Sequence, residues 1–147
     1  MPGVLVIGSD HAGLALKREL AHLAMDLGWD VRDVGTHSSE STDYPDYAHR
    51  VAEAVAEGQG LGLLVCGTGI GMSMAANRHE GVRAAVCSDM YSATMSREHN
   101  DANVLCLGAR VVGVGLASEI LKAFLGARFE GGRHARRVSK IEPSHEG

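Results

Sequence analysis

The sequence lacks the features that mark several large classes of protein. No apolar run reaches the roughly 20 residues of a transmembrane helix, and the start MPGVLVIGSDHAG has no basic region ahead of its short apolar stretch. We therefore expect neither a membrane anchor nor a signal peptide. An excess of basic residues is also missing, because the formal net charge is -4. Nucleic acids and anionic membranes are bound mostly through excess lysine and arginine, so we expect neither as a partner.

Cysteine is scarce, and its placement fits reduced thiols better than a disulfide framework. The 3 cysteines, Cys66, Cys87 and Cys106, form no C-x-x-C pair, and all lie in aliphatic runs. Reduced thiols of this kind are typical of the cytosol, so we expect a cytoplasmic protein. The 8 histidines show neither H-x-x-x-H nor H-E-x-x-H spacing. The spacing predicts no metal site, and we expect no cofactor.

Short aliphatic runs alternate with helical patterns along the chain. The predicted strands are Val4–Gly8, Trp29–Val34, Leu61–Cys66, Val82–Cys87 and Val104–Gly108. Most are nearly continuous apolar stretches, typical of strands buried on both faces of a parallel sheet. The predicted helices are Ala12–Leu27, Tyr47–Ala56, Met72–Arg78, Met90–Arg97 and Val114–Leu125. This alternation predicts a Rossmann-like, doubly wound α/β fold, with a mainly five-stranded parallel sheet and flanking helices.

No linker, repeat or low-complexity stretch divides the chain, so we expect a single domain over residues 1–147. A Gly-Gly pair then precedes a predicted basic helix at 131–142. Four basic residues share one broad face of this helix: Arg133, Arg136, Arg137 and Lys140. Such a face is usually solvated, but two guanidinium groups four residues apart can also clamp one phosphate.

The carboxyl ends of the predicted strands carry the candidate site, because doubly wound sheets bind ligands there. Asp10 and His11 follow the first strand, and Tyr44 lies in the connection after the second. The third strand leads into the turn Gly67–Gly71, whose G-x-G-x-G pattern is neither a dinucleotide fingerprint nor a Walker A loop. Glycines at a helix start expose several N–H groups and make an anion site. A tight turn without a ligand is the alternative.

Cys66 stands directly before those N–H groups. A helix N-terminus favours the thiolate, which is the reactive form of cysteine. Packing in the core is the alternative, and we assign that role to Cys87 and Cys106. The turn REHND also concentrates functional groups, including His99 and Asn100. The alternative to a functional role for His99 is that its protonated ring stabilises the dipole at the end of a helix.

Five segments taken together resemble ribose-5-phosphate isomerase type B, the family that also includes galactose-6-phosphate isomerase subunits. They are SDHAG, SSESTDYPDYA, CGTGIGMSMAANR, SREHNDANVLCLGARVVG and FEGGRHARRV, and they stand in the family's order. The resemblance implies interconversion of ribose 5-phosphate and ribulose 5-phosphate through an enediolate, without metal or nucleotide. It also implies a homodimer, in some members a tetramer, with shared active sites.

The resemblance further implies a role for each matching residue. Cys66 matches the general base, His99 the residue that opens the sugar ring, and Asn100 a contact to the enediolate or substrate. The anion hole matches Gly67, Thr68, Gly69, Ile70 and Gly71. The remaining contacts to the sugar and its phosphate match Asp10, His11, Tyr44, Arg110, Arg133 and Arg137. His134 lies where family members differ in preferred sugar length. In the family, His99, Asn100 and Arg110 reach the site from the partner chain.

Two alternatives remain open at this point. The same scaffold can isomerise a six-carbon sugar phosphate, such as allose or galactose 6-phosphate. A non-catalytic module that binds a phosphorylated metabolite is the other. That module needs the glycine turn and the arginines, but it has no need of Cys66 and His99 together.

Overall fold

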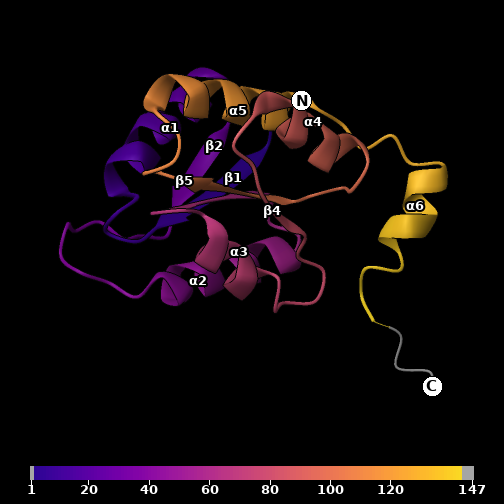
Figure 1. Cartoon of the computed structure of the whole chain (residues 1–147), viewed down its shortest axis with the longest axis horizontal. Coiled ribbons are helices and arrows are strands. Elements are labelled where there is room, and N and C mark those ends of the chain that lie inside the picture. Colours follow the sequence, from indigo (N-terminus) through magenta and orange to yellow (C-terminus); the bar gives the residue numbers. More distant parts are fainter. Residues whose placement is uncertain (1, 144–147) are drawn as a thin grey trace.

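A single parallel sheet runs through the protein (Figure 1), which is described here by a computed structural model covering residues 2–143. Its strands are β1 (Val4–Ser9), β2 (Asp30–Asp33), β3 (Leu61–Cys66), β4 (Ala84–Val86) and β5 (Val104–Gly108). The helices are α1 (Leu14–Asp26), α2 (Tyr44–Ala56), α3 (Ile70–Ala76), α4 (Met90–Glu98), α5 (Val114–Gly126) and α6 (Arg133–Val138). No helix in this range is long and apolar enough to cross a membrane.

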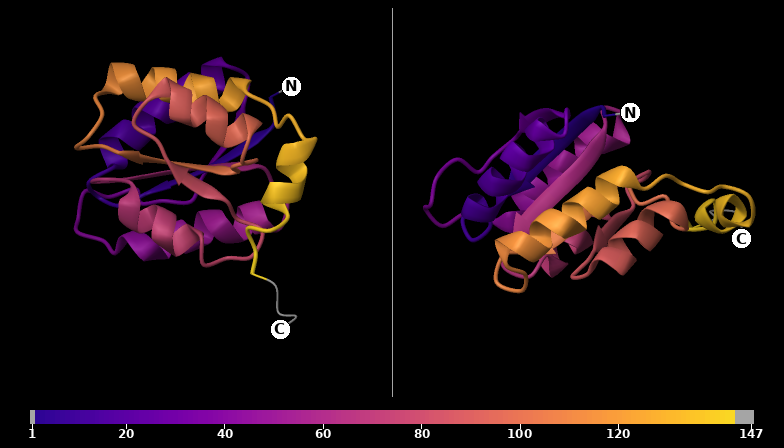
Figure 2. Two further views of the ribbon diagram at one scale, coloured as in Figure 1. Left: turned by 45° about the vertical axis from the view of Figure 1, so that its right-hand side comes forward. Right: turned by 90° about the horizontal axis from the view of Figure 1, so that it is seen from above.

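The order of the strands confirms the predicted Rossmann-like fold. It is β2-β1-β3-β5-β4, and every neighbouring pair is parallel. Helices α2 and α3 cover one face of the sheet, whereas α1, α4 and α5 cover the other (Figures 1 and 2). The chain leaves β1 and β3 toward opposite faces. This is the switch point at which such sheets open a crevice for ligands.

The core follows from the side-chain alternation of the three central strands. In β3, Leu63 and Val65 pack beneath α1 and α5, while Leu64 and Cys66 face α2 and α3. All of these side chains are buried. Burying an aliphatic side chain contributes about 1.5–3 kcal/mol, so the aliphatic strands fix the position of the turn that follows Cys66.

The edge strand β4 differs from the prediction. β4 spans only Ala84–Val86, shorter than the predicted Val82–Cys87, and its residues are half-buried or exposed. It lies at an edge of the sheet and pairs with β5 alone, so its other side lacks a neighbour within the described chain. An apolar run does not distinguish a central strand from an edge strand, which is why the prediction of burial on both faces is wrong here.

Local chemistry sets two helix starts that frame the candidate site. Helix α2 begins at Tyr44, earlier than the predicted Tyr47, because Pro45 occupies its first turn, where a missing N–H costs nothing. Helix α3 begins at Ile70 because Gly69 adopts φ 81°, a left-handed conformation that ends the preceding turn.

Helix α6 stands apart from both helix layers (Figures 1 and 2). None of its residues is buried. It follows Gly131 and Gly132, whose positive φ values of 70° and 57° turn the chain away from α5. The tail is tied back to the body by the N–H of Glu130, which donates to the carbonyl of Glu98 at 3.0 Å.

Candidate active site

The carboxyl edge of the sheet holds one group of the predicted residues around a cavity. This open cavity has a volume of about 370 Å³, and it is lined by Asp10, Tyr44, Cys66, Gly67, Thr68, Ile70 and Gly71. The residues come from the ends of β1 and β3 and from the starts of α2 and α3. Adjacent parallel strands end at the same edge, so sequence reasoning could bring these residues together.

The thiol of Cys66 is held by the turn that follows it. The N–H of Gly69 donates to Cys66 Sγ at 3.1 Å and so fixes the position of the sulfur at the start of α3. The N–H of Ile70 donates to Thr68 Oγ1 at 3.2 Å and fixes that hydroxyl at the start of α3. Ile70 itself is exposed on the rim. The turn therefore combines a sulfur with polar hydrogen-bonding groups at the mouth of one cavity.

Two side chains lie so close to the turn that glycine is required or favoured there. A Cβ at Gly71 would lie 2.5 Å from the ring of Tyr44, so the tyrosine packs directly over the start of α3. A Cβ at Gly67 would lie 3.4 Å from Arg110 Nη1. The resemblance implies that Arg110 arrives from a partner chain. In this structure its guanidinium lies against the turn of its own chain, because β5 pairs with β3 and their loops are neighbours.

Asp10 and His11 are fixed by hydrogen bonds at the end of β1. The buried carboxylate of Asp10 accepts the N–H of Gly13 at 3.1 Å. His11 Nδ1 accepts the N–H of Thr42 at 3.1 Å. A neutral His11 ring therefore carries its proton on Nε2, where it can donate to a ligand. His11 does not itself line the cavity, but it stands beside Asp10, which does.

The second group of predicted residues lies at the opposite edge of the sheet. Helix α4 starts at the carboxyl edge after β4 and runs back across the sheet, so His99 and Asn100 at its end reach the amino edge. Helix α6 lies at that end too, away from the loop between β2 and α2 (Figure 1). Within one chain, the structure does not bring His99 to Cys66.

The residues of this second group contact one another. The rings of His99 and His134 are stacked, with centroids 4.2 Å apart, and His99 Nε2 lies 3.4 Å from Glu130 Oε1. Loss of solvent around the ring, followed by the positive charges of His99, Arg133 and Arg137, lowers the pKa of His134. His134 therefore favours its neutral form. Arg133 and Arg137 lie with His134 on α6. Their role in binding a phosphate stays a prediction.

Sequence reasoning missed Glu130, and it also missed the contact between His49 and His79. His49 Nδ1 and His79 Nε2 are 2.7 Å apart and join α2 to the turn after α3. The two histidines are thirty residues apart in the chain, so their spacing carries no signal. Glu130 stands four residues before His134, and that E-x-x-x-H spacing is the one signal that was available.

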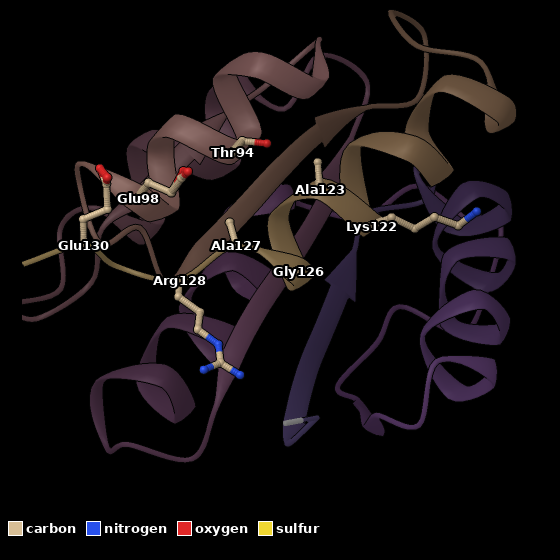
Figure 3. Close-up of a pocket in the computed structure, with 8 residues that line it drawn as sticks. All are labelled: Thr94, Glu98, Lys122, Ala123, Gly126, Ala127, Arg128 and Glu130. Carbon is tan, nitrogen blue, oxygen red and sulfur yellow. The ribbon is translucent and has the colours of Figure 1, made fainter.

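Another cavity, away from the carboxyl edge, does not contain the thiol. It measures about 510 Å³ and lies between the ends of α4 and α5, where it is lined by Thr94, Glu98, Lys122, Ala123, Gly126, Ala127, Arg128 and Glu130. Figure 3 shows that Arg128 and Lys122 point away from the two glutamates, so the charged groups do not converge on one point. It is lined by no cysteine, and we place the candidate active site at Cys66.

The other two cysteines are poor nucleophiles. Burial, together with the charge of Asp89, raises the pKa of Cys87 to about 11. Burial also raises the pKa of Cys106, which is fully enclosed in β5. Both thiols therefore stay protonated near neutral pH, and only a thiolate reacts readily.

Iodoacetamide should therefore modify Cys66 first. At pH 7.5 we expect its alkylation to be at least about tenfold faster than that of Cys87 or Cys106, because only Cys66 borders an open cavity and accepts an N–H. Peptide mapping by mass spectrometry over time gives the three rates. Equal rates for Cys66 and Cys87 would show that Cys66 is an ordinary buried thiol.

Comparison with known proteins places the chain among sugar-phosphate isomerases. Residues 5–141 match the family described as Ribose/Galactose Isomerase. Ribose-5-phosphate isomerase B of Escherichia coli is 54% identical over 138 residues, which are 93% of each chain. D-erythrulose-4-phosphate isomerase of Pectobacterium atrosepticum is 45% identical, over 93% of this chain and 91% of that one.

Solved structures agree with the sequence relatives. Ribose-5-phosphate isomerase B of Clostridium thermocellum superposes with a TM-score of 0.92 at 56% identity, covering 94% of each chain. The Thermotoga maritima ribose 5-phosphate isomerase gives the same TM-score at 45% identity, covering 96% of this chain and 98% of that one. The family match and the structural matches extend over nearly the whole sequence. The chain therefore belongs to the ribose/galactose isomerase family.

Proposed function

We propose that this protein interconverts D-ribose 5-phosphate and D-ribulose 5-phosphate. The observation that carries the proposal is the thiol of Cys66, held by an N–H at the mouth of a cavity in a chain 54% identical to a ribose-5-phosphate isomerase B. The three cysteines form no disulfide bond, which is consistent with a protein that functions in the cytosol.

The proposed chemistry is a proton transfer between two carbons. Cys66 removes the proton from C2 of the open-chain aldose and returns it to C1 of the enediolate. A positioned base of this kind contributes about 10²–10⁴ in rate. The enediolate oxygen carries negative charge, and we assign its stabilisation to polar groups of the turn Gly67–Gly71. One well-aimed donor is worth about 3–4 kcal/mol.

Ring opening and phosphate binding fall to the second group of residues. Ribose 5-phosphate is mostly a closed furanose, so an acid-base group must open it before C2 can react. We assign this step to His99, with Asn100 as a contact to the sugar. Arg133 and Arg137 bind the phosphate, and the remote phosphate then positions C1 and C2 against the sulfur. Arg110 lies beside Gly67 and supplies positive charge from the other side.

We propose that each active site combines the Cys66 edge of one chain with the His99 edge of a second. Two observations support a homodimer. The two groups lie at opposite edges of the sheet, so a single chain does not complete the site. Exposed apolar side chains also flank the open edge at β4, on α3, β4 and α4: Ile70, Met74, Val86, Met90 and Tyr91. A second copy that covers this edge would bury them, as in closed two-fold dimers.

An assay of the purified protein tests the activity itself. With a chelator present, we expect turnover of ribose 5-phosphate at a rate above that of allose 6-phosphate or D-erythrulose 4-phosphate. The chelator should not lower the rate, because the proposed base and donors are all protein groups. The named activity of the Pectobacterium relative makes the four-carbon substrate a necessary comparison. No turnover of any of the three sugars would favour a binding module instead.

Arg137→Ala should raise KM for ribose 5-phosphate by roughly 10- to 100-fold, because a charge-assisted hydrogen bond contributes about 1.5–3 kcal/mol. Arg136→Ala is the matched control, since Arg136 is equally exposed on α6 but has no proposed contact with the phosphate. Initial-rate kinetics of both variants give the two KM values. Equal effects would indicate a diffuse basic surface.

A further inference from the structure

Three side chains from separate parts of the fold meet at the amino edge. They are His99 at the end of α4, Glu130 in the connection after α5, and His134 on α6; we call them the His99 cluster. Their possible ligand atoms all lie within 4.8 Å of one another. His99 Nε2 is 3.4 Å and His134 Nε2 is 4.0 Å from the same carboxylate oxygen, Glu130 Oε1.

Two imidazoles and one carboxylate form a donor set that suits Zn²⁺. Zinc binds histidine nitrogen at about 2.0–2.1 Å and carboxylate oxygen at about 2.0–2.2 Å, so two ligands of a tetrahedral ion lie roughly 3.4 Å apart. The His99–Glu130 separation already has that value, and the His134–Glu130 separation exceeds it by a fraction of an ångström. A fourth position would remain for water.

One ring must turn before both imidazoles can bind one ion. The ring planes of His99 and His134 differ by only 9°, and two stacked rings do not point their lone pairs at the same place. The His99 side chain is 40% exposed and has room to rotate. Helix α6 buries no residue and follows a Gly-Gly turn, so it can shift without disturbing the core.

We propose that the His99 cluster binds Zn²⁺ and that the bound ion inhibits the enzyme. Zinc would occupy the nitrogen lone pair of His99 and hold its ring toward Glu130, so the imidazole could no longer exchange protons with the sugar. Arg133 and Arg137 lie on the same short helix as His134, and their charge opposes the dication. Binding is therefore reversible rather than structural. The inhibition rests on the proposed role of His99, whereas the binding does not.

Calorimetry with ZnCl₂ on the Cys66→Ala chain tests the binding without relying on activity. The substitution removes the one thiol that borders an open cavity and could bind zinc itself. We expect one ion per chain at the His99 cluster, with the affinity reduced at least about tenfold in Glu130→Gln and in His134→Asn.

Two control variants locate the ion. Glu119→Gln removes an exposed carboxylate that pairs with Lys122, and His79→Asn breaks the other histidine pair. Neither should weaken the site at the His99 cluster. Unchanged zinc affinity in both Glu130→Gln and His134→Asn, with folding confirmed by circular dichroism, would overturn the proposal.

Kinetics on the chain with Cys66 intact test the inhibition. Turnover of ribose 5-phosphate should fall as ZnCl₂ is added, and excess chelator should restore it. The half-inhibiting concentration should rise at least about tenfold in Glu130→Gln relative to Glu119→Gln, each compared with its own rate without metal. Zinc that binds at the cluster while turnover stays constant would overturn the inhibition and leave the binding site standing.

Discussion

The Cys66→Ala variant should turn over ribose 5-phosphate about 10²–10⁴ times more slowly than the parent chain, because it loses the proposed base for the transfer between C2 and C1. No other sulfur lines the cavity, and its one carboxylate is not free to replace Cys66 as the base. Asp10 also lines the cavity, but its carboxylate already accepts the N–H of Gly13 and holds the loop after β1. Affinity for the sugar phosphate should change little, since the arginines and the turn remain.

Rate and affinity must be measured separately for this variant. Steady-state kinetics give kcat, and calorimetry on the inactive protein gives the dissociation constant of ribose 5-phosphate. Cys87→Ala is the matched control, because it also removes a buried thiol next to a strand end, but outside the cavity. That control should retain nearly full kcat. A Cys66→Ala variant with a near-normal kcat would reduce the sulfur to a packing group.

The central strands were predictable because their chemistry is local. The bounds of β3 and β5 agree with the aliphatic runs Leu61–Cys66 and Val104–Gly108, where burial and β-propensity act together. β4 was mispredicted because, within residues 2–143, it pairs with a strand on one side only, and the order of strands in a sheet is a long-range property. The early start of α2 was missed because the prediction began the helix at Tyr47 and did not use Pro45, a residue favoured in the first turn of a helix.

The group of site residues around Cys66 was predictable from the sequence. Asp10 follows β1 and Cys66 ends β3, which is parallel and adjacent to β1, and the carboxyl ends of such strands share an edge. The same rule also places the end of α4 at the other edge, so the separation of His99 from Cys66 was within reach of the sequence. The meeting of His99 with Glu130 and His134 was not, because it depends on the path of the tail after α5.

Mixing two inactive variants should restore activity, because we propose that each active site is shared between two chains. Cys66→Ala and His99→Asn should each be nearly inactive as homodimers, since every site then lacks one essential group. Unfolded together in equal amounts and refolded, they should form mixed dimers as about half of the population. Each mixed dimer has one site with both defects and one site with neither.

Activity of the refolded mixture is the most direct test that the Cys66 edge of one chain works with the His99 edge of another. Roughly a quarter of the parent activity should return if sites act independently. Each variant refolded alone is the control and should stay nearly inactive. If each site lay within a single chain, every site in the mixture would still carry a defect. No recovery, with mixed dimers confirmed by native mass spectrometry, would contradict the shared site.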